Sequence, residues 1–197
     1  MSKDKIARRG FILGGVAVFA YGCTPMTQMA GPPGAAARAF ASVDPRYRRR
    51  RVRYDGGDAP GTIVVDTNER YLYYVEGDGW ATRYGVGVGE EGRTLRGQVS
   101  VGRKAEWPSW TPTANMMREK PRLVQYAGGV EGGPNNPLGA RALYLYKGGQ
   151  DTMFRLHGTN EPWTIGHAVS SGCIRLTNDD IINLYERTPV GATVIVV

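Results

Sequence analysis

The sequence contains few of the residues that build disulfide frameworks and metal centres. Its 197 residues include two cysteines, Cys23 and Cys173, and two histidines, His157 and His167. A small disulfide-stapled fold uses several cysteine pairs, and a structural zinc site normally has four ligands. His157, His167 and Cys173 would supply too few ligands, so we expect neither a metal site nor a disulfide.

Long apolar runs and nucleotide-binding motifs are also absent. The apolar run over residues 11–21 is shorter than the stretch of about 20 residues with which a helix crosses a bilayer. There is no internal repeat, no P-loop and no dinucleotide fingerprint, so we expect no nucleotide cofactor. A hydrophobic content of 41% against 22% charged residues, with 28 glycines, predicts a globular domain with many turns between short strands.

The first residues have the pattern of an export signal. A basic start precedes the apolar run, and we assign residues 1–23 to this signal. Arg8 and Arg9 resemble a twin-arginine signal, and the alternative is an ordinary basic start for the general secretion route. Cys23 ends a segment similar to a lipobox, although Tyr21 departs from that pattern. The end of the signal is therefore compatible with two outcomes, a lipid anchor at Cys23 or an ordinary export signal.

The next segment, residues 24–59, has the composition of a flexible, arginine-rich linker. Its first part is rich in Ala, Gly, Pro and Met, and residues 46–54 hold six arginines interleaved with tyrosines. Such a stretch resembles a nucleic-acid patch. In an exported protein, a solvated tether or a contact with anionic lipid or cell-wall polymer fits better. We expect a solvated tether and no nucleic-acid partner.

From residue 60 onward, short runs of β-branched and aromatic residues alternate with turn residues. These runs predict strands at residues 62–66, 71–75, 80–88, 142–146, 154–157 and 193–197. One short helix is expected from residue 178, with Asn178 as its cap and Ile181 and Leu184 on its apolar face. The predicted fold is mainly β, of sandwich or barrel type, with one or two short helices.

A candidate nucleophile lies near the end of this domain. Cys173 follows Gly172 and precedes Arg175 by two residues, and His157 lies upstream. A lone cysteine is most often a small buried hydrophobe, but an unpaired thiol is unusual in an oxidising compartment. His157 can act as a base, and Arg175, on the same face of an extended segment, would favour the thiolate. The main-chain amides around Ser171, Gly172 and Cys173 are candidates for an oxyanion hole.

The same residues carry a family resemblance. His157-Gly158-Thr159-Asn160, then Ile165-Gly166, then Ser170-Ser171-Gly172-Cys173-Ile174-Arg175 resemble the signature of the L,D-transpeptidase (YkuD-type) catalytic domain. Upstream, residues 108–112 and 136–142 resemble two further elements of this family, and residues 178–180 and 190–194 resemble its closing helix and strand. The resemblance covers roughly residues 60–197 in co-linear order, which makes it far more specific than one short pattern.

The resemblance implies a cysteine acyltransferase that acts on the peptide stems of peptidoglycan in the periplasm or cell envelope. It implies Cys173 as nucleophile and His157 as base, with Gly172 and Ser171 at the oxyanion hole. Substrate-binding and shaping roles then fall to Arg175, Gly158, Thr159, Asn160 and Ser170. His167 is either a rival base or a substrate contact. The family uses no metal and no cofactor.

Alternatives remain open for the second half of the reaction and for the function as a whole. The acceptor can be the amine of a second stem, an amine of an outer-membrane protein, or water, which would give a carboxypeptidase-like enzyme. The alternative from a different class is a non-catalytic, wall-binding envelope lipoprotein that keeps the fold. The presence of Cys173, His157 and Arg175 together favours an enzyme, since a binding protein does not need that trio.

Overall fold

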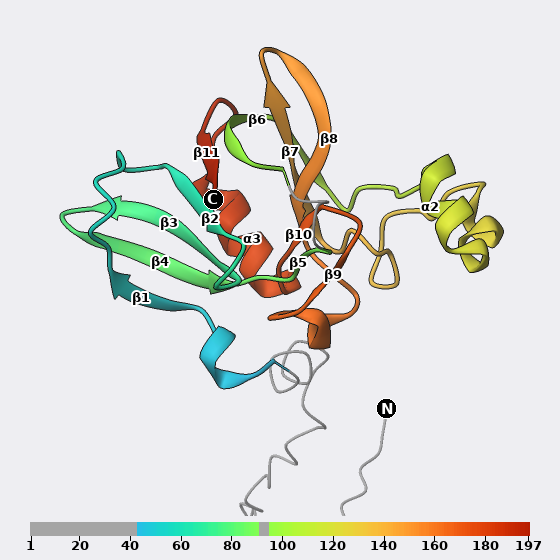
Figure 1. Ribbon diagram of the computed structural model, residues 1–197, viewed down its shortest axis with the longest axis horizontal. Helices are drawn as coiled ribbons and strands as arrows, with labels where there is room; N and C mark the ends of the chain where they lie inside the picture. Colours follow the sequence, from blue (N-terminus) through green and yellow to red (C-terminus); the bar gives the residue numbers. More distant parts are fainter. Residues whose placement is uncertain (1–42, 91–94) are drawn as a thin grey trace, which may run out of the picture. The chain divides into compact units, whose positions relative to one another are not determined.

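Nine strands form one sheet in the computed structural model, which describes residues 43–90 and 95–197 (Figure 1). The strand order is β1-β4-β3-β2-β11-β6-β7-β8-β10, and a second sheet pairs β5 with β9. In chain order the elements are η1 (Pro45–Tyr47), β1 (Arg50–Arg53), β2 (Ile63–Asp66), β3 (Tyr71–Gly77), β4 (Trp80–Gly85), β5 (Val88–Gly89), β6 (Gly97–Glu106), α2 (Ala114–Glu119), η2 (Pro121–Tyr126), β7 (Arg141–Lys147), β8 (Gln150–His157), η3 (Pro162–Thr164), β9 (Ala168–Ser170), β10 (Ile174–Arg175), α3 (Asn178–Arg187) and β11 (Thr193–Val196).

The mainly β class is confirmed. Each of the six predicted strand regions contains a strand, although the region at residues 80–88 divides into β4 and β5. Two α-helices, α2 and α3, occur among the described residues, together with three short 3₁₀ turns. The strand β2 lies inside the sheet between β3 and β11, and its side chains are buried on both faces. Its run of β-branched residues suits such a position.

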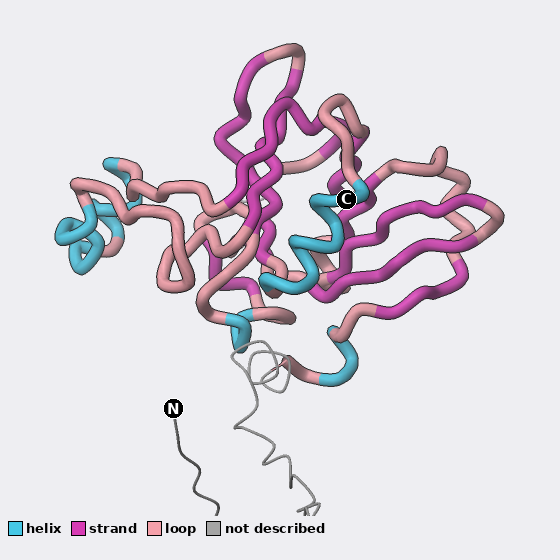
Figure 2. The backbone as a smooth tube through the Cα atoms, turned by 180° about the vertical axis from the view of Figure 1, so that it is seen from behind, coloured by secondary structure: helices cyan, strands magenta, loops and turns pink. Residues whose placement is uncertain are grey.

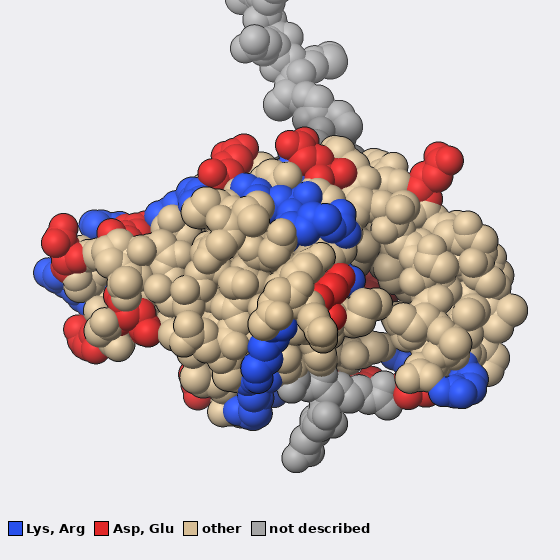
Figure 3. Space-filling view, turned by 90° about the horizontal axis from the view of Figure 1, so that it is seen from above, with Lys and Arg blue, Asp and Glu red and all other residues tan. Residues whose placement is uncertain are grey.

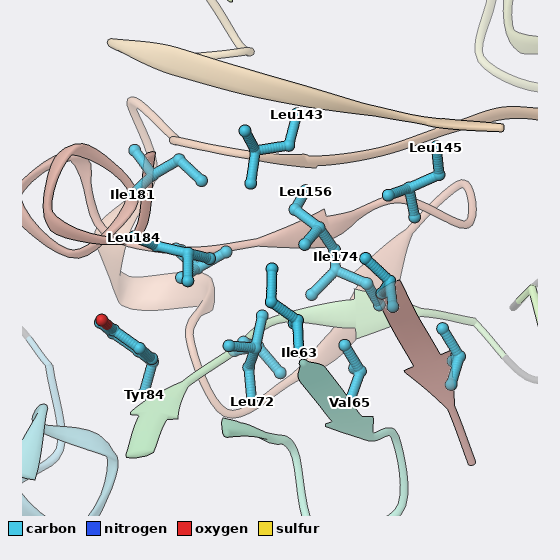
Figure 4. Packing of buried hydrophobic residues seen from close by; sticks show 14 of the residues in the cluster. Ile63, Val65, Leu72, Tyr84, Leu143, Leu145, Leu156, Ile174, Ile181 and Leu184 are labelled. Carbon is cyan, nitrogen blue, oxygen red and sulfur yellow. The ribbon is translucent and has the colours of Figure 1, made fainter. Parts of the chain in front are cut away.

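One hydrophobic core joins the two halves of the large sheet around α3. In Figures 1 and 2, β2, β3 and β4 lie on one side of α3, and β7 and β8 lie on the other. Figure 4 shows Ile63, Leu72 and Tyr84 pointing toward Leu156, Leu184 and their neighbours. Since Leu156 and Ile174 belong to this core, the strands β8 and β10 that carry the candidate site are anchored in it.

The N-cap of α3 lies one residue earlier than the sequence suggested. Thr177, not Asn178, is the N-cap, because its side-chain oxygen accepts a hydrogen bond from the Asp180 amide at 3.1 Å. Asn178 is the first helical residue, and its Oδ1 accepts from the Ala140 amide at 2.9 Å. The expected cap is therefore wrong by one position, and Asn178 instead ties α3 to the chain that enters β7.

The expectation of a flexible linker is wrong for residues 45–53. These residues form η1 and β1, and β1 pairs with β4 in antiparallel register. The guanidinium groups of Arg51 and Arg53 lie 4.3 and 4.0 Å from the centre of the Trp80 ring, and Arg51 also pairs with Glu76 at 2.7 Å. Arginine side chains can thus cover an aromatic residue and stabilise a strand at the edge of a sheet.

The predicted export signal (residues 1–23), the lipid anchor at Cys23 and the first part of the predicted linker (residues 24–42) lie outside the described residues. Within residues 43–90 and 95–197, the structure contains no helix whose length and apolar character would suit passage through a bilayer.

Candidate active site

Parallel pairing between β8 and β10 brings four cleft-facing side chains together. In this register, Leu156 lies opposite Ile174 and His157 lies opposite Arg175. Leu156 and Ile174 point into the core, so the alternating residues of both segments point the other way. The outward set is Arg155 and His157 on β8, with Cys173 and Arg175 on the neighbouring segment; all four line one cleft.

The cleft has a volume of about 630 Å³ and lies between the sheet and residues 107–140, here called the α2 segment. Figure 3 shows the hollow between the α2 segment, at the right of that view, and the rest of the described domain. The lining residues are Ser109, Trp110, Thr111, Thr113, Asn115, Met116, Glu119, Pro137, Leu138, Tyr144, Met153, Phe154, Arg155, His157, Ser170, Ser171, Cys173 and Arg175. Such a volume is typical of a small-molecule or peptide site.

His157 is held as a neutral imidazole with a defined tautomer. The side chain is 4% exposed, and Nδ1 lies 2.5 Å from the Gly158 carbonyl oxygen. Because a carbonyl oxygen only accepts hydrogen bonds, Nδ1 carries the proton and Nε2 keeps its lone pair. Burial, and next the nearby charge of Arg175, lower the pKa of His157 to about 3, while the Gly158 hydrogen bond opposes this shift.

Cys173 is a free thiol with opposing electrostatic influences. Burial raises the pKa of Cys173, since a thiolate loses solvation inside the protein. A hydrogen bond from the main chain of Arg155, followed by the charges of Arg155 and Arg175, acts in the opposite direction. With the thiol pKa raised and the imidazole pKa lowered, the cleft holds a neutral thiol and a neutral imidazole at rest.

The turn before Cys173 uses the Gly172 amide for its own structure. Gly172 has a φ of 129°, which suits glycine, and its amide donates to the Ser170 hydroxyl oxygen at 3.1 Å. The Ser170 hydroxyl in turn donates to the Cys173 carbonyl at 2.6 Å. Within the described part of the chain, the amides of Ser171 and Cys173 have no protein acceptor. The oxyanion-hole candidates therefore narrow to these two amides, and Gly172 and Ser170 shape the turn.

Arg175 is fixed between the core and the cleft. Its main chain exchanges two hydrogen bonds with Gly87, at 2.8 and 2.9 Å. Its Nη1 lies 3.1 Å from Glu161 Oε2, and the side chain is 20% exposed. A guanidinium that is already oriented by one carboxylate at the edge of a cleft can bind the carboxylate of a ligand with its remaining donors.

Three residues of the expected substrate-binding set lie outside the cleft. A side chain at Gly158 would collide with Asn178 Oδ1, so this glycine permits the close approach of α3. Thr159 is buried and accepts from the Glu161 amide at 3.0 Å, and Asn160 donates to the Asn135 carbonyl at 3.0 Å. These contacts shape the loop after His157, whereas Ser170 and Ser171 do line the cleft.

His167 is not brought to Cys173. It is exposed, it is absent from the cleft lining, and its main chain bonds to Thr164 and Val88. This position does not suit a rival base for the thiol. Among residues 43–90 and 95–197, no group of three or more His, Cys, Asp or Glu side chains could hold a metal ion.

The structure adds residues that the sequence analysis did not single out. Arg155 lies two residues before His157 on the same strand, so strand alternation could have placed it on the same face. Glu161 pairs with Arg175, and Asp151 pairs with Arg155. Residues 108–112 and 136–142, at the two ends of the α2 segment, carried a family signal. The helices α2 and η2 between them had none, because neither contains a buried residue that would create an apolar stripe.

Comparison with known proteins identifies the class to which this fold and cleft belong. A family model for the L,D-transpeptidase catalytic domain (YkuD) matches residues 60–197. The chain therefore belongs to the L,D-transpeptidase catalytic-domain family, and the resemblance noted from the motifs is confirmed.

Two curated Escherichia coli K12 proteins are among its relatives. "Probable L,D-transpeptidase ErfK/SrfK" is 43% identical over 136 residues, which cover 67% of this chain and 42% of that protein. "Probable L,D-transpeptidase YbiS" is 36% identical over 137 residues, which cover 68% and 43%. The chain thus matches less than half the length of these relatives.

A solved structure from Brucella melitensis also matches. It is described as a "Probable carnitine operon oxidoreductase caia" and has a TM-score of 0.54 at 44% sequence identity. The match covers 79% of this chain and 97% of the Brucella protein.

Proposed function

We propose that this protein is a cysteine-dependent L,D-transpeptidase that acts on the tetrapeptide stems of peptidoglycan through a Cys173 thioester. The observation that carries the proposal is the shared cleft of Cys173, His157 and Arg175, in which His157 keeps an unprotonated Nε2. Family membership supports the same reaction class. In this assignment Cys173 is the nucleophile, His157 the base and Arg175 the ligand of a stem carboxylate.

The first half-reaction forms the acyl-enzyme. The thiol Sγ attacks the carbonyl carbon before the terminal D-alanine, while the thiol proton passes to His157 Nε2. The oxyanion that forms accepts hydrogen bonds from the amides of Ser171 and Cys173. When it collapses, the carbon–nitrogen bond breaks, and the departing amine of D-alanine takes the proton from Nε2. Because the pKa of His157 is low, Nε2 is unprotonated at neutral pH and can accept the thiol proton during the attack.

The second half-reaction releases the thioester. The side-chain amine of a diamino acid on a second stem attacks the thioester carbonyl and gives a proton to His157 Nε2. The carbon–sulfur bond breaks, and Sγ recovers the proton. The product is a cross-link between two stems. An outer-membrane protein amine or water would react with the same acyl-enzyme and use the same proton path. The product therefore depends on which acceptor attacks the thioester.

The working place that fits this substrate is the periplasm or cell envelope. The basic, apolar start of the sequence supports export, with residues 1–23 as the signal. A lipid anchor at Cys23 would hold the domain next to the envelope, and mass spectrometry of the exported protein tests it directly. The matched relatives extend well beyond the region shared with this chain, so partners of the whole proteins are not carried over.

The test is intact-protein mass spectrometry of the full chain with Cys23→Ser, which leaves Cys173 as the single thiol. Incubation with a tetrapeptide stem, and separately with a carbapenem, should add the mass of the acyl group. Cys173→Ala should abolish both adducts. His157→Gln should slow acylation by about 10²- to 10⁴-fold.

The matched control is His167→Gln, which removes the other histidine at a site outside the cleft. It should acylate at the wild-type rate. A folded protein that forms no adduct with either reagent would exclude the enzyme and favour a non-catalytic wall-binding role. An adduct that persists in Cys173→Ala would exclude the thioester.

A further inference from the structure

A second guanidinium at the cleft is held more firmly than a substrate-binding arginine requires. Arg155 Nη1 lies 3.0 Å from Asp151 Oδ1, and Nη2 lies 3.2 Å from Oδ2, which gives a two-point ion pair. Nη1 also donates to the Phe154 carbonyl at 3.0 Å. The guanidinium carbon lies 4.4 Å from the centre of the Tyr144 ring, and the side chain is 12% exposed. Each contact restricts the side chain, so its charge stays in one place.

A bulge in β8 produces this arrangement. The pairing of β7 with β8 shifts register between Tyr144 and Tyr146, and Met153 in the partner strand has a φ of 64°. Asp151 caps the bulge by accepting from the Met153 amide at 2.8 Å, and the same carboxylate binds Arg155. A left-handed, non-glycine residue is costly and persists where surrounding contacts fix it. Here those contacts also orient the arginine.

The strand residue Arg155 contacts the thiol through its main chain. The β8–β10 register continues from His157 and Arg175 to place Arg155 opposite Cys173, and the main chain of Arg155 bonds to the thiol. Both residues line the same cleft, and the charge of Arg155 acts on the thiol to lower its pKa.

We propose that Arg155 is a positioning residue that stabilises the developing thiolate of Cys173, and that Asp151 sets how strongly it does so. The inference rests on the proposed nucleophilic role of Cys173. Other titratable or charged groups that line the cleft with this thiol are His157 on β8, Arg175 on β10, Tyr144 on β7 and Glu119 on α2; Glu161 pairs with Arg175. Arg155 differs from Arg175 in being the cation opposite the thiol in the strand register.

The charges predict opposite effects for the two members of the ion pair. Arg155→Gln removes a cation next to the thiolate and should raise the apparent pKa of Cys173. Asp151→Asn removes the opposing anion and should lower the apparent pKa of Cys173. The amide oxygen of the new asparagine can still accept a hydrogen bond from Arg155. A merely structural role would move both variants in the same direction, because both would loosen the bulge.

The experiment measures initial rates of Cys173 alkylation by iodoacetamide from about pH 6 to about pH 10, in the full chain with Cys23→Ser. Arg155→Gln should shift the pH profile toward higher pH by about one unit, so alkylation on the acid side should be about tenfold slower. Asp151→Asn should shift it downward. Arg155→Lys keeps the charge and should recover most of the loss.

Arg103→Gln is the matched control. Arg103 comes from β6 and packs on the same Tyr144 ring at 3.4 Å, but it does not line the cleft. Its alkylation profile should equal that of the starting protein. Equal profiles for Arg155→Gln and Arg103→Gln, or shifts of the same sign for Arg155→Gln and Asp151→Asn, would overturn the inference.

Alkylation requires no peptide substrate, so this test is separate from that of the proposed function. If Arg155→Gln and Asp151→Asn shift the profile in opposite directions but no acyl-enzyme forms with the tetrapeptide, the inference about Arg155 stands and the proposed substrate is wrong. If the acyl-enzyme forms but these shifts are absent, the proposed function stands and the inference about Arg155 is wrong.

Discussion

Replacing His157 with glutamine should make the protein lose about 2 kcal/mol less stability between about pH 7.5 and about pH 5. The imidazole is buried, and its pKa falls from 6.5 to about 3, chiefly through burial and then through Arg175. Below pH 6.5 the unfolded chain takes up a proton that the folded protein does not. The folded state is therefore fully stabilised above 6.5 and becomes less stable as the pH falls toward 3.

The size of the effect follows from the separation of the two pKa values. Each pH unit in this window changes the free energy of unfolding by about 1.4 kcal/mol, so His157 should cost about 2 kcal/mol at about pH 5. Glu76 has the next relevant shift. Its hydrogen bonds with Thr82, Arg51 and Arg187 lower its pKa from 4.5 to about 2, so its stabilisation is lost only below 4.5. The window above pH 5 thus excludes the loss that comes from Glu76.

Urea unfolding at both pH values measures the effect. Glutamine at position 157 does not titrate, so the free energy of unfolding of His157→Gln should fall by about 2 kcal/mol less than that of the starting protein. His167→Gln, at an exposed histidine, should follow the starting protein. If His157→Gln and the starting protein lose equal stability between the two pH values, His157 is not held neutral by the fold.

Three further outcomes are expected. Acylation of Cys173 by a tetrapeptide stem should show no loss of rate as the pH falls through 6.5, because the pKa of His157 is about 3; an acid limb centred at 6.5 would contradict this. Deleting residues 1–53 should lower the free energy of unfolding by about 2–4 kcal/mol relative to a chain that starts at Val43, because buried Val43 and Tyr47 and the strand β1 are lost; equal thermal unfolding would contradict it. Thr177→Ala should cost about 1 kcal/mol in chemical unfolding through loss of the α3 cap, while the neighbouring surface variant Asp179→Asn should cost less.

Most of the large sheet could be predicted because its strands have a sequence pattern of their own. Runs such as Ile63–Asp66 and Tyr71–Gly77 are rich in β-branched or aromatic residues and are bounded by turns. The helix α3 could be predicted for the same reason, since Ile181 and Leu184 fall on one face. These signals are local, so no knowledge of the tertiary structure is needed to read them.

The elements that escaped prediction depend on partners distant in sequence. The strand β1 consists almost entirely of arginines, and its stability comes from pairing with β4 and from covering Trp80. The helix α2 has six residues and buries none of them. Neither segment has a periodic apolar pattern, so composition alone favoured a linker or a loop.

The candidate site was partly accessible from the sequence. Its motif spacing pointed to His157 and Cys173, and both line the cleft. The hydrogen bond that occupies the Gly172 amide depends on the fold of the turn, and a side-chain acceptor such as Ser170 is not evident from a glycine-rich motif. The ion pair between Asp151 and Arg155 depends on a bulge whose register shift only pairing with β7 defines.

The position of β11 has a consequence for the order in which the protein can be assembled. This strand follows every other strand of the large sheet along the chain, yet it lies in the middle, with β2 on one side and β6 on the other. A growing chain that has produced β1 to β10 therefore holds two half-sheets without the strand that joins them. Cys173 and His157 are synthesised before that joining strand, so the domain cannot complete its core around them until Val196 has left the ribosome.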